Sequence, residues 1–409
     1  MAALTVVIGF ILLSLLLMSF SFFQTYISKK ITSYISKEIN SQLSLDNIKF
    51  TFFNRLTAKN ILIKDQNLDT LLFLPQLTAT IKKIDIKNQD FRLGKVVALK
   101  PSFFLITDSS GLTNVKWYLD MMKKEEKKSN PGKFMMRMER AEVKEGRFCQ
   151  IKMIRPESKT RMDYRNIRIS GIDFAMNNFF VKGDSVYMEI DGAKMKEQCG
   201  FGLKDMTSKL SVYNKKIVFT DAIIECDSSE INASLIAVLG DPISGFKNFN
   251  NKAIFDIKIN SSEISGQDLK YLVPLKEMPE NRFSFEGEVK GTVSELRGRK
   301  IRINGMDETD VYMNFTLSGL PDIKNTFIFC EINSLKTSAN DLMLIRIPGG
   351  KSLMLPENIR KIENITFTGS FTGFINDFVT YGKLYTPYGS VSTDVSLRPE
   401  GSGIFAIKG

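Results

Sequence analysis

The side chains that most often do chemistry in enzymes are scarce in this chain, and histidine is missing altogether. The sequence has 409 residues and no histidine. Imidazole is the general base of Ser-His-Asp and Cys-His sites, the usual nitrogen ligand of zinc, and a proton shuttle near neutral pH. These classes of site are therefore excluded. Chemistry by carboxylates or lysines stays open, so catalysis is disfavoured rather than forbidden.

Cysteine and glycine patterns do not supply the missing chemistry. The four cysteines are far apart and form no Cys-x-x-Cys pair, so their spacing indicates neither a metal site nor a redox motif. The Gly-Lys-Ser triplet at 350–352 resembles the end of a phosphate-binding loop, but the first glycine of that motif would fall on Ile345. We find no paired-carboxylate cluster. The sequence therefore predicts no catalytic residue, no metal site and no cofactor, and we expect the protein not to be an enzyme.

Charge and composition favour a sheet-rich protein without a nucleic-acid surface. Lys and Arg number 56 against 45 Asp and Glu, a net charge of +11. The cations are scattered along polar positions, whereas a nucleic-acid surface needs a basic stripe. The excess charge favours solubility and attraction to anionic lipid headgroups. With 31 Phe against a single Trp, the aromatic content suits half-buried pleated surfaces.

The first 23 residues predict a transmembrane anchor. They contain no charged side chain, and about 20 such residues span a hydrocarbon core. A cleaved signal peptide is the alternative, but it would have a shorter apolar core and a small-residue cleavage site. Lysines follow the segment and none precedes it, so either the positive-inside rule places the body in the cytoplasm or a basic N-terminal stretch is missing from this sequence. The anchor residues are Val6, Ile8, Phe10, Leu12, Leu15 and Leu17.

Residues 24–45 predict an amphipathic helix. Isoleucine or leucine recurs every four residues from Ile27 to Leu43, with polar residues between. Such a stripe usually packs on the body of its own protein. A second interpretation is a helix that leaves the membrane and delivers the chain to a groove.

From residue 46 to 409 the dominant period is two, which is typical of strands with one apolar and one polar face. Turn signals every 8–15 residues or so predict about 20–25 strands joined mainly as meanders. No helix alternates with them, so a βαβ architecture is excluded. A short helix is expected at 262–272, and no strict internal repeat is evident. The predicted fold is mainly β: an elongated antiparallel sheet with a few short helices.

The apolar face of such a sheet has to be covered. Two closed sandwiches would cover it with the chain's own side chains. A sheet folded along its length would instead leave an apolar trough, and the membrane anchor and the absence of long crossovers favour this second arrangement. Exposing two long lipid tails costs on the order of 20 kcal/mol, so a continuous trough could hold acyl chains. The residues expected to line it are Phe255, Ile257, Phe283, Phe285, Val289, Met313, Phe315, Phe367 and Phe371.

Several segments resemble the AsmA-like family and, within it, the TamB-like proteins. The resemblance lies in the order anchor, amphipathic helix and short strands, and in the segments 45–50, 54–65, 91–96 and 369–378. It implies an open β-groove over 46–409 that continues beyond the chain end. It also implies an inner-membrane anchor, a periplasmic body, phospholipid as cargo and an Omp85-type outer-membrane barrel as partner.

Two functions of different classes follow. The first is a membrane-anchored periplasmic conduit that carries phospholipid between the inner and outer membranes. The second is a scaffold for outer-membrane protein translocation and assembly, which would work with the Omp85-type barrel and pair with client strands through exposed sheet edges.

Overall fold

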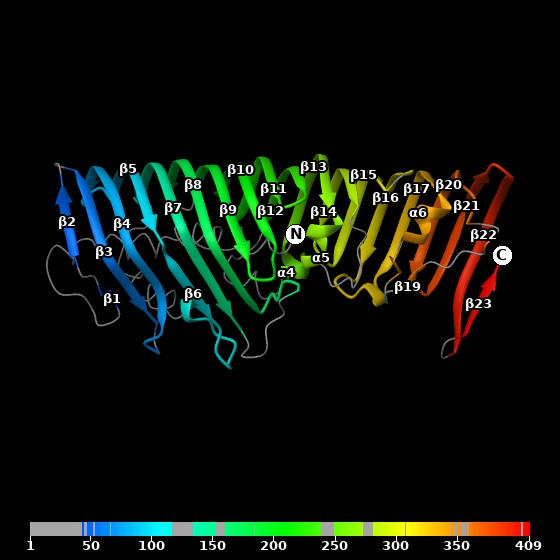
Figure 1. Cartoon of the computed structure of the whole chain (residues 1–409), viewed down its shortest axis with the longest axis horizontal. Coiled ribbons are helices and arrows are strands. Elements are labelled where there is room, and N and C mark those ends of the chain that lie inside the picture. The colour runs from blue at the N-terminus through cyan, green and yellow to red at the C-terminus, as the bar shows by residue number, and fades with distance from the viewer. Residues whose placement is uncertain are drawn as a thin grey trace. The chain divides into compact units, whose positions relative to one another are not determined.

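The computed structural model describes residues 43–44, 47–51, 54–65, 67–116, 134–152, 160–183, 185–238, 249–272, 281–306, 308–344, 346–347, 351–352, 357, 360–401 and 404–409. The predicted anchor and residues 24–42 of the predicted amphipathic helix lie outside this set. The described part has 23 strands and few helices, which confirms the mainly β prediction (Figure 1). Within these ranges no helix is long and apolar enough to cross a bilayer.

The chain divides into two compact units, and unit 1 ends at Asp227. Its first strand is β1 (Leu43–Ser44). The amphipathic helix predicted for residues 24–45 was therefore wrong at these two residues. The other strands are β2 (Asn47–Thr51), β3 (Arg55–Lys64), β4 (Thr70–Asp85), β5 (Asp90–Leu99), β6 (Ser102–Ile106), β7 (Met135–Ile151), β8 (Asn166–Lys182), β9 (Ser185–Glu197), β10 (Gly202–Tyr213) and most of β11 (Lys216–Cys226).

One connection in unit 1 departs from the predicted antiparallel meander. Strands β5 and β6 follow one another along β4, and both pair with β7 in parallel, from Asp90 opposite Met135 to Ile106 opposite Ile151. The chain therefore makes a crossover between Ile106 and Met135 before it continues alongside. Sequence periodicity reports which face a residue occupies and not the direction of the neighbouring strand, so the prediction of antiparallel pairing throughout was wrong here.

Unit 1 has a closed apolar core. Strands β9 and β10 pair antiparallel, and every second side chain points to one face. On that face Met188, Leu210 and Val212 are at most 2% exposed. Burial this complete stabilises each large side chain by about 1.5–3 kcal/mol relative to full exposure.

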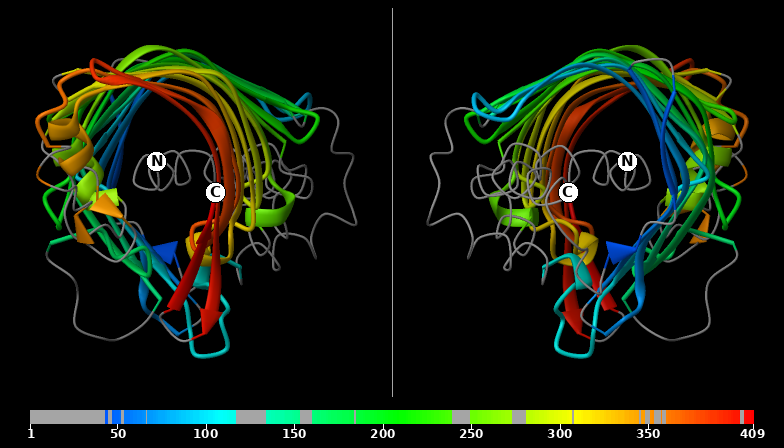
Figure 2. Two further views of the ribbon diagram at one scale, coloured as in Figure 1. Left: turned by 90° about the vertical axis from the view of Figure 1, so that its right-hand side faces the viewer. Right: turned by 90° about the vertical axis from the view of Figure 1, so that its left-hand side faces the viewer.

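Unit 2 contains the remaining elements, and Figure 2 shows that its long strands are strongly bent. Its elements are β12 (Glu230–Val238), α4 (Phe249–Lys252), β13 (Ile254–Ser265), α5 (Gly266–Leu272), β14 (Arg282–Gly291), β15 (Glu295–Gly305), β16 (Thr309–Ser318), η3 (Ile323–Asn325), β17 (Phe327–Thr337), α6 (Ala339–Leu344), β18 (Arg346–Ile347), β19 (Lys351–Ser352), β20 (Ile365–Phe374), β21 (Asp377–Thr386), β22 (Gly389–Gly401) and β23 (Ile404–Lys408). The helix predicted at 262–272 is α5, and residues 262–265 instead continue β13.

The order of elements repeats within unit 2. Two long strands with a short helix between them, a second short helix and two more long strands occur as β12, α4, β13, α5, β14, β15. The same order recurs as β16, η3, β17, α6, β20, β21, with the short strands β18 and β19 inserted after α6. The segment 259–269 matches 332–342 at six of eleven positions. The β-bulges after Ile259 and Ile332 fall at equivalent places in the two copies. The repeat is an approximate one, which is compatible with the absence of a strict repeat in the sequence, because loops of unequal length hide it from a search for one fixed period.

In each copy the short helix carries a buried aspartate. Asp268 of α5 accepts a hydrogen bond from the backbone N–H of Ser228 (2.9 Å). Asp341 of α6 accepts one from the N–H of Glu308 (2.9 Å) and another from the hydroxyl of Thr309 (2.7 Å). Each aspartate therefore joins its helix to the turn before the first strand of its own copy.

Candidate functional site

The candidate site is one face of the long strands of unit 2, which we call the apolar face. Residues directly opposite in neighbouring strands share a face, so the register defines its rows. Each strand step is about 4.8 Å, so the seven strands β13 to β17, β20 and β21 extend for roughly 29 Å. The central row consists of Ile257, Val289, Gly298, Phe315, Cys330, Phe371 and Thr380.

All nine residues expected to line a trough lie on this face, because each occupies one of its register rows. All nine are half-buried, and so is every residue of β16. This differs from unit 1, where the equivalent side chains of β9 and β10 are almost fully covered. The apolar face of unit 2 is therefore partly open along strands that come from both copies of the repeat.

No charged side chain interrupts the described rows of the apolar face. Besides the central row, a second row begins at Phe285 and a third at Ile301, and both contain only aliphatic, aromatic, glycine and threonine residues up to β22. The second row consists of Phe285, Ile303, Val311, Leu335, Phe367, Leu384 and Val391, and the third of Ile301, Met313, Ile332, Gly369, Gly382 and Thr393.

The opposite face, which we call the polar face, carries the charges of the same strands. Asp256, Glu286 and Thr316 alternate with residues of the apolar face and therefore point away from it. Oppositely charged side chains of adjacent strands form ion pairs on this face. Because the pairs are exposed to solvent, each contributes at most about 1 kcal/mol to stability. The pairs are Asp256–Lys290 (3.0 Å), Glu286–Arg302 (3.7 Å) and Glu263–Arg282 (3.4 Å).

Glycines allow aromatic rings on the apolar face to lie flat against the sheet. A Cβ placed on Gly298 would overlap the ring of Phe315, and one on Gly305 would overlap the ring of Phe283. Gly382 has the same relationship with Phe367. Each ring thus lies over the backbone of the adjacent strand, which covers a glycine and lowers the height of the aromatic side chain.

The sequence pattern missed several residues of this face. Ile301 is fully buried and Ile303 is half-buried, but a bulge at 299–300 shifts the alternation of β15 and hides them. Cys330 and Ile332 were missed because β17 carries phenylalanine on its polar face as well, at Phe327 and Phe329. The alternation alone does not identify the inward face of that strand. The pairing of Cys330 with Phe315 does so.

The only titratable group in the described rows of the apolar face is the thiol of Cys330. It lies 3.4 Å from the sulfur of Met313, and burial raises its pKa. A thiol with a raised pKa stays neutral at physiological pH, so the face carries no charge there. Among the described residues, no group of three or more His, Cys, Asp or Glu side chains could hold a metal ion.

Comparisons of the chain with protein families, with curated proteins and with solved structures found no match.

Proposed function

We propose that this protein is a membrane-anchored periplasmic lipid-transfer conduit of the AsmA-like class, and that phospholipid acyl chains lie on the apolar face of unit 2. The observation that carries the proposal is a half-buried face without charged side chains that crosses strands from both copies of the repeat. The charged side chains of these strands are on the polar face.

The energetics favour such a path for lipid over transfer through water. Removing a methylene from water contributes about 0.8 kcal/mol, so exposing two long tails costs on the order of 20 kcal/mol. A tail that moves from one row of the apolar face to the next, about 4.8 Å away, stays in contact with apolar atoms. Such movement needs no nucleophile, metal or cofactor in the protein.

The low surface of this face also suits the proposal. An aromatic ring that stands upright would close a trough, whereas the rings of Phe315 and Phe367 lie over glycines of adjacent strands. The polar face has no comparable continuity, because Thr316, Asn314 and Glu331 interrupt its aromatic residues. The anchor would be in the inner membrane, and an Omp85-type barrel in the outer membrane would be the partner.

Photocrosslinking of the full chain in phospholipid vesicles tests the proposal. A benzophenone amino acid at Phe315 or Phe371 should capture radiolabelled phospholipid. Matched controls at Glu286 and Thr372 each lie one residue after an apolar-face residue and point to the polar face, so they should capture little. Circular dichroism of each variant checks that the sheet is intact.

Two outcomes would contradict a lipid conduit. Equal capture at Phe315 and Glu286 would show that the two faces contact lipid alike, as in non-specific association. Capture of a polypeptide and no lipid at Phe371 would show that the apolar face contacts protein, which would contradict the conduit and favour the assembly scaffold.

A further inference from the structure

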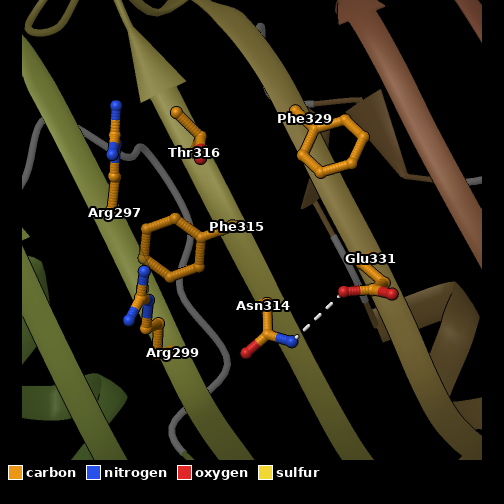
Figure 3. Close-up of a pocket in the computed structure, with 8 residues that line it drawn as sticks. Arg297, Arg299, Asn314, Phe315, Thr316, Phe329 and Glu331 are labelled. Carbon is orange, nitrogen blue, oxygen red and sulfur yellow. Dashed lines mark hydrogen bonds between the residues drawn. The ribbon is translucent and has the colours of Figure 1, made fainter.

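A second candidate site lies on the polar face of unit 2, on the opposite side of the sheet from the apolar face. It is a pocket of about 370 Å³ where β15, β16 and β17 lie side by side (Figure 3). Strand β15 contributes two arginines, β16 two short polar side chains, and β17 an aromatic ring and a carboxylate. These six residues are Arg297, Arg299, Asn314, Thr316, Phe329 and Glu331, and Gly298 and Phe315 of the apolar face line the pocket as well.

The register arranges these side chains in two rows, each of which runs from an arginine on β15 to a residue of β17. Arg297 is opposite Thr316, which is opposite Phe329. In the next row Asn314 is opposite Glu331, and Arg299 is on the β15 side of that row. Two strand steps separate the arginines from β17, about 10 Å between backbones. The pocket therefore has a cationic side and, across a polar floor, a side with one ring and one carboxylate.

A β-bulge fixes the cationic side. The register of β15 against β16 shifts between Gly298 and Ile301, and Lys300 within the bulge has φ of 52°. The backbone N–H of Lys300 donates to Oδ1 of Asn314 (2.9 Å). Nδ2 of the same amide donates to Glu331 (3.3 Å), drawn as the dashed line in Figure 3. Asn314 thus holds both the bulge and the carboxylate, and bulges commonly re-aim side chains at functional sites.

The charged side chains of the pocket form no ion pair among the described residues, whereas several on the surrounding face do. Lys290 and Arg302 on the same face are each ion-paired. Within the described ranges, Arg297 and Arg299 have no carboxylate within salt-bridge distance, and Glu331 has no ammonium or guanidinium partner. The pocket therefore combines two unpaired cations and one unpaired anion, separated across its floor.

We propose that this pocket binds a small zwitterion, with a phosphate ester between Arg297 and Arg299 and an ammonium group against Glu331. Guanidinium groups match phosphate oxygens in charge and geometry, and a carboxylate is the natural partner of an ammonium group. The short carbon link between the two charges would lie over Thr316, beside the ring of Phe329. A free phosphoethanolamine and the headgroup of a phosphatidylethanolamine share this chemistry.

Titration of the full chain with O-phosphoethanolamine, followed by calorimetry or ligand-observed NMR, tests the site. Because the pocket is open to solvent, we expect a dissociation constant on the order of 1 mM. Arg297→Gln or Arg299→Gln should each weaken binding about tenfold. Glu331→Gln should remove the preference for phosphoethanolamine over inorganic phosphate. Arg282→Gln is the matched control, because that arginine lies on the same face but pairs with Glu263 (3.4 Å).

The arms of the titration separate the sources of the ligand. Tighter binding of a short-chain phosphatidylethanolamine than of free phosphoethanolamine points to a lipid headgroup, and equal binding points to the free compound. Inorganic phosphate bound as tightly as phosphoethanolamine by the unmodified chain would overturn the proposal, as would equal weakening by Arg282→Gln and Arg297→Gln. The absence of binding below about 10 mM would overturn it too. None of these results depends on lipid at the apolar face.

Discussion

The ring of Phe315 on β16 lies over Gly298 on β15, in the space that a Cβ at residue 298 would occupy. The two residues are directly opposite in the register. Gly298 has ordinary backbone angles, so the ring, and not the backbone, requires glycine there. The same relationship at Gly305 and Gly382 makes it a general feature of the apolar face.

This contact predicts strong coupling between the two residues. Gly298→Ala should reduce the free energy of unfolding by about 1–3 kcal/mol, because the ring must leave its place. Phe315→Leu, which leaves room for the new methyl group, should make a second change to Ala at 298 nearly neutral. A double-mutant cycle by urea denaturation measures the coupling, expected at about 1–2 kcal/mol. Additive effects of the two substitutions would contradict the contact.

The ion network around Glu142 in unit 1 predicts loss of stability in acid. Arg140 donates to this carboxylate (2.7 Å), and Lys95 lies 2.8 Å from it. Hydrogen bonds from Arg140 and then Lys95 lower the pKa of Glu142 from 4.5 to about 2. At pH values between these two pKa values, the carboxylate at 142 binds more protons in the unfolded chain than in the folded one. The stabilisation is therefore complete above pH 4.5 and is lost as the pH falls toward 2.

Glu142→Gln isolates this contribution. The variant should lose stability at pH 6 and should show a shallower decline between pH 4.5 and 2.5 than the unmodified chain. Unfolding free energies from urea titrations at several pH values measure both effects. A decline of unchanged steepness in the variant would mean that other carboxylates dominate the acid response.

The sequence predicts the chemistry of each strand better than the connections between strands. Alternation placed Phe255, Val289 and Phe367 on one face, because side-chain direction is a local property of an extended backbone. The parallel pairing of β5 with β7 depends on a crossover, which leaves no trace in the alternation. The pocket on the polar face depends on a bulge at 299–300 and on three strands in register, and neither follows from one strand's sequence.

The two buried aspartates of the repeat predict a graded pair of effects. Asp341 accepts from the Glu308 N–H and the Thr309 hydroxyl and is 1% exposed, so Asp341→Ala removes the buried acceptor of two part-buried donors. We expect a loss of about 2–3 kcal/mol. Asp268 accepts from the Ser228 N–H, so Asp268→Ala should cost less, about 1–2 kcal/mol.

Thermal and urea unfolding of both variants measures these effects. Asp377→Ala is the control, because Asp377 is exposed at the start of β21 and its replacement should change stability by less than about 0.5 kcal/mol. A larger loss for Asp268→Ala than for Asp341→Ala would contradict the assignment of these contacts.

The thiol of Cys330 provides a direct test of lipid occupancy on the apolar face. In a chain with the other three cysteines replaced by serine, its alkylation by N-ethylmaleimide should be slow at pH 7, because burial raises its pKa and only the thiolate reacts. The rate should increase about tenfold for each pH unit below that pKa.

A short-chain phospholipid added to the full chain in amphipol should slow the reaction further, since Cys330 lies in the central row beside Phe315 and Phe371. The control carries Cys330→Ser and Thr368→Cys, which moves the thiol to the polar face outside the pocket, and its rate should not respond to lipid. Protection of both thiols to the same degree would show that lipid does not prefer the apolar face, and the conduit would have to be abandoned.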